Sequence, residues 1–212
     1  MEIIWHGHGT FQINGAGKVV YTDPYVLKDD AVKADFILVT HGHYDHCDIE
    51  KIEKIRKSET IVIAEEKAAA KISGAKPIKS GQKIDLGDIK VLAVPSYNPQ
   101  KVFHPKGFGI GFIIEIEEKR IYQAGDTDVI EEMKDLGDID VALLPAGGKY
   151  TMDLSEALEA VRYIKPTIAI PYHYNTLDGL ELTPKELSNF KSRVEQSTST
   201  KVELLDEKIM EM

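Results

Sequence analysis

The chain has 212 residues, of which 42% are hydrophobic and 29% are charged, and these are ordinary values for a soluble globular protein. The length fits a single domain spanning residues 1–212 with a sizeable core. No apolar run approaches the roughly 18 residues that would cross a bilayer. The formal net charge of −9 weighs against nucleic acid as a partner, because phosphate backbones are bound chiefly by clustered Lys and Arg.

The start of the chain gives no sign of export. Residues 1–6 have neither the basic region nor the apolar region of a signal peptide. The single cysteine, Cys47, excludes an internal disulfide framework and fits a reducing compartment. We therefore expect a cytoplasmic protein that does not insert into a membrane.

Short strands dominate the first part of the chain. Alternating or continuous apolar patterns predict strands at residues 2–5, 10–13, 19–22, 36–39 and 60–64. A helix is expected directly after His46, with Ile49, Ile52 and Ile55 on one face. A second helix is expected at residues 65–72, because Gly74 follows as a stop signal.

The second part of the chain continues with strands and interspersed helices. Strands are predicted at residues 83–86, 89–94, 108–116, 120–124, 141–144 and 167–170. A short helix is expected between Asp128 and Gly137. Asp153 and Thr183 each precede a glutamate by three residues, which is the capping box that begins a helix.

This order of elements lacks the regular alternation of a parallel doubly wound sheet. Two mixed β-sheets packed face to face, with helices outside, fit it better. No linker, low-complexity segment or tandem repeat interrupts the pattern. The sequence therefore predicts an α/β (α+β) fold in one domain.

Four potential metal ligands occur within six residues, directly after the predicted strand 36–39. These residues are His41, His43, Asp45 and His46. Histidine nitrogens and carboxylate oxygens are the ligands that zinc and similar divalent ions prefer. A tight loop at a strand end directs alternate side chains differently, so the motif has the ligands for two neighbouring ions. The alternative is a polar surface loop that happens to be rich in histidine.

Two further candidate ligands also follow predicted strands. Asp126 comes after strand 120–124, and His173 comes after strand 167–170. Each has a simpler explanation when it is taken alone: Asp126 as a turn former or helix cap, and His173 as a hydrogen-bonded core histidine. Three clusters of ligands at strand ends in one chain favour a metal site instead.

With these residues the sequence resembles the metallo-β-lactamase-fold superfamily, whose marker is His-x-His-x-Asp-His followed by a later His, a Gly-Asp and a C-terminal His. The resemblance extends over essentially the whole chain. Within the superfamily the chain is most similar to a small hydrolase branch that includes ascorbate-6-phosphate lactonase-like and N-acylphosphatidylethanolamine phospholipase D-like proteins. The segments that carry this resemblance are residues 5–9, 124–127 and 145–152. The family implies a four-layer αββα sandwich with the metal ions at one edge of the sheets.

The resemblance also implies a set of ligands. His41 and His43 would hold the first metal, Asp45, His46 and His173 the second, and Asp126 would bridge the two. The family's third histidine for the first metal normally follows the strand that here ends at Pro95, but this chain has Ser96-Tyr97-Asn98 at that point. His104 is the one histidine left in the right region, so we expect it to complete the first site. A surface position or a contact with substrate is the alternative for His104.

Several other residues receive roles by the same resemblance. Asp23 is expected to support the metal-binding loop, with a turn before Pro24 as its alternative, and His8 to contact substrate or a ligand. A buried structural position is expected for Cys47 rather than a nucleophilic role. His6 is expected to be structural or exposed.

Such a site predicts a metal-dependent hydrolase with two divalent ions, for which zinc is expected and manganese or iron are the alternatives. A metal-bridged hydroxide would attack an ester, lactone, amide or phosphodiester bond of a small-molecule substrate. Asp45 would orient the water or accept its proton, and Asp126 would hold the ion pair. The chain could also form a homo-oligomer.

Three other activities remain as alternatives. A nuclease or phosphodiesterase of the same fold is disfavoured by the charge of −9. A non-enzymatic metal-binding or ligand-binding module is kept open by the displaced third histidine. A di-iron oxidoreductase is disfavoured because those relatives usually carry Glu at the position of His43.

Overall fold

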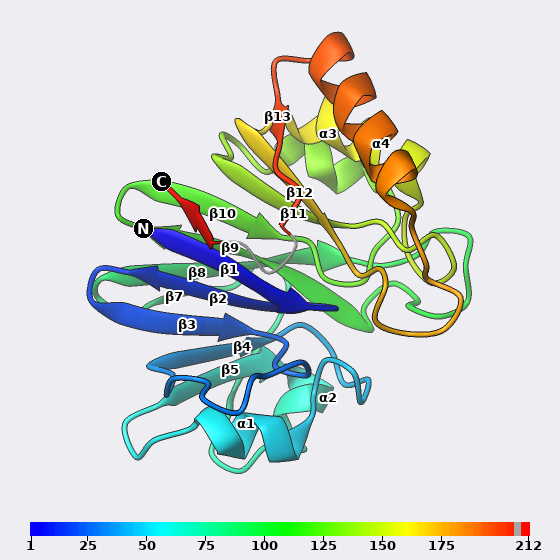
Figure 1. The fold of residues 1–212 in the computed structure, drawn as a ribbon. Helices are drawn as coiled ribbons and strands as arrows, with labels where there is room; N and C mark the ends of the chain where they lie inside the picture. The colour runs from blue at the N-terminus through cyan, green and yellow to red at the C-terminus, as the bar shows by residue number, and fades with distance from the viewer. Residues whose placement is uncertain (206–208) are drawn as a thin grey trace.

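Two seven-stranded β-sheets lie face to face in the computed structural model, which describes residues 1–205 and 209–212 (Figure 1). The first sheet has the strand order β14 (Ile209–Glu211), β1 (Glu2–Gly7), β2 (Thr10–Gly15), β3 (Lys18–Thr22), β4 (Phe36–Val39), β5 (Ile61–Glu65) and β6 (Lys76–Ile78). The second has the order β13 (Lys201–Val202), β12 (Ile168–Tyr172), β11 (Val141–Pro145), β10 (Lys119–Gln123), β9 (Gly109–Ile116), β8 (Ile89–Ser96) and β7 (Lys83–Asp85).

Both sheets are mixed, as the sequence predicts, and they share one succession of pairings. In the first sheet β14, β1, β2 and β3 pair antiparallel, and β3 to β6 pair parallel. In the second sheet β7 to β10 pair antiparallel, and β10 to β13 pair parallel. The architecture therefore repeats, although the sequence shows no repeat.

Helices cover the outer face of each sheet, which gives the four layers of the expected αββα sandwich. Buried residues of α1 (Ile49–Ile55) and α2 (Glu66–Ala69) pack on the first sheet. Buried residues of α3 (Leu154–Ile164), α4 (Pro184–Ser197) and the 3₁₀ turn η1 (Glu131–Asp135) pack on the second. The capping boxes predicted at Asp153 and Thr183 are both present.

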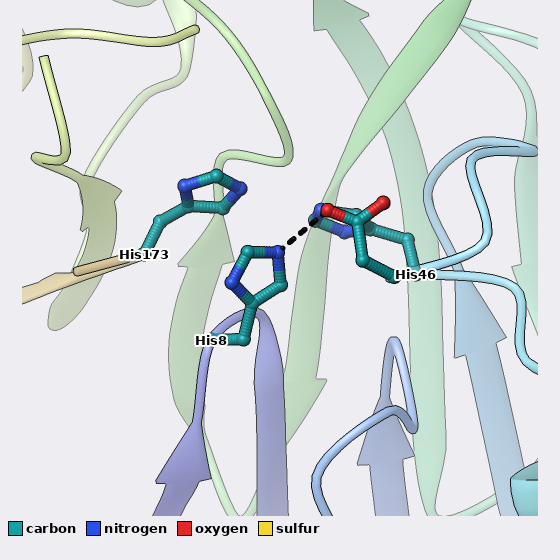
Figure 2. A group of neighbouring side chains, drawn as sticks. His8, His46 and His173 are labelled. Carbon is teal, nitrogen blue, oxygen red and sulfur yellow. Dashed lines mark hydrogen bonds and ion pairs between the residues drawn. The ribbon is translucent and has the colours of Figure 1, made fainter. Parts of the chain in front are cut away.

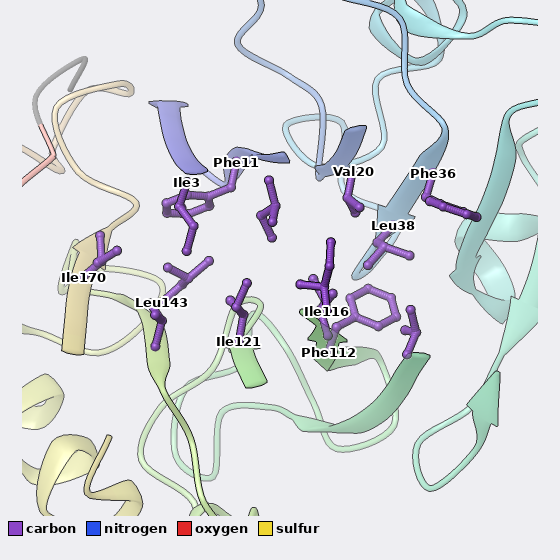
Figure 3. Close-up of a cluster of buried hydrophobic side chains, with 14 of the residues drawn as sticks. Ile3, Phe11, Val20, Phe36, Leu38, Phe112, Ile116, Ile121, Leu143 and Ile170 are labelled. Carbon is purple, nitrogen blue, oxygen red and sulfur yellow. The ribbon is translucent and has the colours of Figure 1, made fainter. Parts of the chain in front are cut away.

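The largest apolar cluster lies between the two sheets (Figure 3). Ile3, Phe11 and Leu38 come from the first sheet, and Phe112 and Ile170 come from the second, and each of them is buried. Burial of such side chains contributes roughly 1.5–3 kcal/mol each. This contact fixes how the loops at the end of one sheet lie against those of the other.

Some predicted elements need correction. The second helix spans Glu66–Ala69 rather than 65–72, because the Glu65 carboxylate caps it and Lys71 and Ile72 already bond three residues back in tight turns. The segment after Asp128 forms a 3₁₀ turn rather than an α-helix. The short strands β6, β13 and β14 were not predicted, because two or three residues are too few for a pattern. Among the described residues, no helix is both long and apolar enough to span a membrane.

Candidate metal centre

The predicted site residues lie on loops that follow strands of both sheets. His41 to His46 follow β4 of the first sheet. His104, Asp126 and His173 follow β8, β10 and β12 of the second. Figure 2 shows His8, from the turn between β1 and β2, together with His46 and His173, which approach it from opposite sides. The fold thus brings residues that are distant in the sequence to one edge of the sandwich.

His41, His43 and His104 form one group of potential ligand atoms. His41 Nε2 lies 3.1 Å from His43 Nδ1, and His104 Nε2 lies 3.2 Å from the same atom. In this group each residue offers a nitrogen within 4.8 Å of the others. His104 is buried, and the loop after β8 brings its ring next to His43.

A second group of potential ligand atoms contains His8, Asp45, His46 and His173. His8 Nε2 donates a hydrogen bond to Asp45 Oδ2 at 2.9 Å (Figure 2). His8 is fully buried and does not line the cavity described below, so its position fits a partner of Asp45 rather than a contact with substrate.

The carboxylate of Asp126 lies between the two groups. Its Oδ2 is 3.3 Å from His104 Nε2 and 3.1 Å from His173 Nε2, and its Oδ1 is 3.4 Å from His46 Nε2. His41, His46 and Asp126 also form a potential ligand group of their own. One carboxylate thus faces both candidate sites.

Asp23 is a buried hydrogen-bond acceptor beneath both groups. Its Oδ2 accepts from His46 Nδ1 at 2.9 Å and from the Thr40 hydroxyl at 2.7 Å, and its Oδ1 accepts from the Thr40 backbone N–H. The Thr40 hydroxyl in turn accepts from His41 Nδ1 at 3.0 Å. These bonds fix the tautomers of His41 and His46, so that Nε2 of each ring faces the centre.

Asn98 does the same for His104. Its side-chain oxygen lies 2.8 Å from His104 Nδ1, which leaves Nε2 directed toward His43. In the sequence Asn98 is notable only for standing where the family's histidine is missing, and nothing there foretells this contact. Thr40 was missed in the same way, since its one signal is its position next to His41.

Burial and neighbouring charges divide the histidines into two kinds. Burial, with the positive charge of His46, holds the pKa of His41 well below its usual range, and burial lowers that of His104 to about 4. Burial also lowers the pKa of His43. For His46 burial acts in the same direction, but the carboxylates of Asp126 and Asp23 outweigh it and hold its pKa well above the usual value.

The two carboxylates stay ionised in this environment. Burial alone would raise the pKa of Asp45, but the hydrogen bond from His8 and the charge of His46 lower it to about 2. The charges of His173 and His46 likewise outweigh burial at Asp126, whose pKa is well below its usual range. The centre therefore offers anionic oxygens beside two kinds of imidazole, those with a lowered pKa and the protonated ring of His46.

Several buried polar atoms at the centre lack a hydrogen-bond partner of good geometry among the described residues. They are His46 Nε2, His173 Nε2 and Asp126 Oδ1. Unsatisfied buried polar atoms cost roughly 1–3 kcal/mol each, and all three point to the region between the ligand groups. Divalent metal ions fit these donors, because nitrogen and carboxylate ligands satisfy both their charge and their coordination.

The backbone is held in a less common conformation at three residues of the centre. His8, Asp23 and His173 have positive φ angles of 50°, 42° and 65°. Such angles are uncommon for residues other than glycine and cluster at functional sites. They aim the three side chains inward from the ends of their strands.

A cavity of about 230 Å³ opens onto the centre. Five candidate ligand residues line it, namely His43, Asp45, His104, Asp126 and His173. Tyr44, Phe103, Tyr150 and Leu177 form the rest of its lining.

Tyr172, Tyr174 and Cys47 do not line this cavity. All three side chains are buried in the packing of the protein.

The chain is similar to known proteins over most of its length. Residues 2–173 match the model of the β-lactamase superfamily domain. A UPF0173 metal-dependent hydrolase of Thermoplasma acidophilum is 40% identical over 203 residues, which cover 87% of this chain and 88% of that protein.

Solved structures show the same fold. A crystal structure from Parabacteroides distasonis has a TM-score of 0.87 and 33% identity, covering 97% of this chain and 93% of its own. Igni18, a metallo hydrolase of Ignicoccus hospitalis, has a TM-score of 0.82 and 26% identity, covering 100% and 98%. This chain therefore belongs to the β-lactamase superfamily and is a metal-dependent hydrolase with the metallo-β-lactamase fold.

Proposed function

We propose that the protein is a binuclear hydrolase that cleaves an ester, lactone or phosphodiester-type bond of a small substrate. The first metal site consists of His41, His43 and His104, and the second of Asp45, His46 and His173, with Asp126 binding both ions. The observation that carries this proposal is the position of Asp126, whose two oxygens lie 3.1–3.4 Å from histidine nitrogens of both groups. Zinc suits this set of nitrogen and oxygen donors, and manganese or iron are the alternatives.

When bound, a pair of divalent ions supplies an activated water and a Lewis acid for the scissile carbonyl or phosphoryl oxygen. The residues of the chain would orient that water and hold the two ions. His8 holds Asp45 through Oδ2, so Asp45 Oδ1 would remain available to a bound ion or to a hydrogen bond from the water. Asp126 would bind both ions and so fix the position of one group of ligands relative to the other.

A nuclease activity is less well supported. Among the residues that the structure describes, no Lys or Arg lines the cavity. A polynucleotide would need such side chains along its path, because its phosphates are bound mainly by cationic groups.

Metal analysis of site-directed variants tests the proposal. After reconstitution with zinc, the protein is expected to hold about two ions per chain. Asp126→Ala should lose both ions, His104→Ala should lose the first, and His173→Ala should weaken the second. His6→Ala is the matched control, because His6 lies outside both ligand groups and bonds to Gln12.

Activity is then measured with a panel of phosphodiesters, lactones and carboxylic esters. Turnover of one class by the reconstituted protein, and its loss in Asp126→Ala, are the expected results. A protein that takes up no zinc or manganese, or an Asp126→Ala variant with full metal content and activity, would contradict the proposed ligands.

A further inference from the structure

Four apolar or aromatic side chains line the cavity together with the candidate ligand residues. They are Tyr44, Phe103, Tyr150 and Leu177, here called the apolar rim. Tyr44 is 68% exposed and Phe103 is 42% exposed, and the neighbouring Val102 is 85% exposed. Large apolar side chains gathered in the open around a polar centre mark a binding surface.

The apolar rim is built into the loops that carry the ligands. Tyr44 lies between His43 and Asp45 in the chain, and Phe103 directly precedes His104. Leu177 follows His173 by four residues, in the loop between β12 and α4. A group that occupies the cavity beside the candidate ligands therefore lies next to these side chains as well.

Phe103 and Tyr150 pack against each other in the lining of the cavity. Their ring centroids are 4.8 Å apart, and the rings are nearly perpendicular at 88°. Tyr150 comes from the loop between β11 and α3, which contributes no ligand. An edge-to-face pair of this kind is a stable apolar surface on which an acyl chain or a ring can pack.

The charge around the opening is the second observation. No cationic side chain is among the described residues that line the cavity. The exposed Lys149 has its Nζ 5.0 Å from the Tyr150 ring centroid, but it is not part of that lining. An anionic group of the substrate beyond the scissile bond would thus find no cationic partner among the described residues that line the cavity.

We infer that the substrate presents an uncharged apolar group, an acyl chain or a ring, to the apolar rim while its scissile bond lies at the ligand residues. This inference rests on the proposed function, because the metal centre must hold the polar end. Phe103 and Tyr150 are then the residues that determine specificity for the apolar end.

Hydroxamates separate the two ends of the substrate. Acetohydroxamate carries a chelating group with a methyl tail, octanohydroxamate carries the same group with a seven-carbon tail, and succinic monohydroxamate carries an anionic tail. Affinity is measured by calorimetry on the zinc-reconstituted protein, so no turnover is needed. Octanohydroxamate is expected to bind at least about tenfold more tightly than acetohydroxamate, because apolar surface is buried. The anionic probe should gain nothing.

Two rim variants and one control localise the effect. In Phe103→Ser and Tyr150→Ala the ratio of the two affinities should fall at least about threefold. A disturbance of the metal centre would change both affinities alike, so it cancels in the ratio. The affinity for acetohydroxamate alone reports such a disturbance. Met212→Ser is the control, because Met212 is an exposed apolar residue whose backbone bonds to Met1, at the opposite end of β1 from His8.

The outcomes are distinct. If acetohydroxamate binds but octanohydroxamate binds no more tightly, or if the anionic probe binds best, the apolar rim is not a substrate subsite. A ratio that stays unchanged in both rim variants also refutes the subsite. If acetohydroxamate does not bind at all, the metal centre itself is refuted and this inference is refuted with it.

Discussion

The side-chain oxygen of Asn98 accepts two hydrogen bonds from His104, one from the backbone N–H at 3.0 Å and one from ring Nδ1 at 2.8 Å. The Asn98 backbone N–H in turn donates to the His104 carbonyl at 2.7 Å. Three bonds between two residues six positions apart close the loop that replaces the family's usual histidine. They set both the position and the tautomer of a proposed ligand.

Asn98→Ala should therefore weaken the first metal site without removing a ligand. The expected loss of affinity is about ten- to a hundredfold, as for other partners of ligating histidines. Asn98→Asp is the matched control, because a carboxylate keeps the acceptor and should restore most of the affinity. Zinc titration with a competing chelator measures both, and equal affinities in Asn98→Ala and wild type would argue against this role.

Metal binding to the metal-free protein should release a proton from His46. Its pKa is raised well above the usual value, so at pH 7 the ring carries protons on both nitrogens, and a metal at Nε2 must displace one of them. His41, His43 and His104 have lowered pKa values and contribute none. Because the proton competes with the metal, apparent affinity should rise with pH up to the raised pKa of His46.

Calorimetry in buffers of different ionisation enthalpy counts these protons. About one proton per chain is expected from His46, in addition to any from bound water. Asp23→Asn removes one of the charges that raise the pKa of His46, so this variant should release fewer protons at the same pH. Identical proton counts in the two proteins would show that His46 is not the source.

Gly125 should not tolerate a side chain. Its φ is +67°, and a Cβ atom there would lie 2.7 Å from the Ile110 carbonyl oxygen and 2.9 Å from Ser96 Oγ. Gly125→Ala is expected to lower the free energy of unfolding by about 1–3 kcal/mol and to weaken metal binding, because Asp126 follows directly.

Gly17→Ala is the control for Gly125→Ala. Gly17 has nearly the same φ, +68°, but nothing lies within 4 Å of its Cβ position. This variant should show only the backbone penalty of roughly 1 kcal/mol and unchanged metal affinity. Chemical denaturation and metal titration measure both variants, and equal effects would rule out the steric explanation.

Lys101 should stabilise the loop that carries His104. Its Nζ donates to Asp128 Oδ1 at 2.6 Å and to the Thr151 carbonyl at 2.7 Å, across to the segments beside Asp126 and α3. Lys101→Met should lower the free energy of unfolding by about 1–2 kcal/mol, between the values for exposed and buried ion pairs. It should also weaken the first metal site.

Lys106 in the same loop provides the comparison. It pairs with Glu132 at 2.9 Å, and its side chain is 68% exposed. Lys106→Met should therefore change stability much less than Lys101→Met, because solvent screens an exposed ion pair. If the two methionine variants are equally stable and bind zinc equally, Lys101 does not hold the loop.

Much of the fold was predictable because the core strands are long enough to show a pattern. The apolar run at residues 36–39 and the capping boxes at Asp153 and Thr183 specify their elements locally. The strand β14 was not predictable, because its partner β1 lies at the other end of the chain and three residues show no periodicity.

The candidate site divides in the same way. Candidate ligands at strand ends were visible in the sequence, and the structure brings His104 beside His43 and Asp126. The contacts that orient the ligands were not, because Asn98 and Thr40 are ordinary loop residues until the fold brings their side chains to a histidine. The sequence also did not reveal that the two sheets share one succession of strand pairings. Strand pairing depends on topology, and the two halves of the chain show no repeated sequence.

The proposed ligands are divided between the two sheets, with His41 to His46 on one and His104, Asp126 and His173 on the other. Metal occupancy and the docking of the two sheets then become a single linked equilibrium. An ion that binds both sets of ligands would link the two sheets. A chelator that removes the ion would weaken the packing between the sheets that Figure 3 shows. The linkage is reciprocal. A core substitution that shifts one sheet against the other should change the metal affinity, although it replaces no ligand.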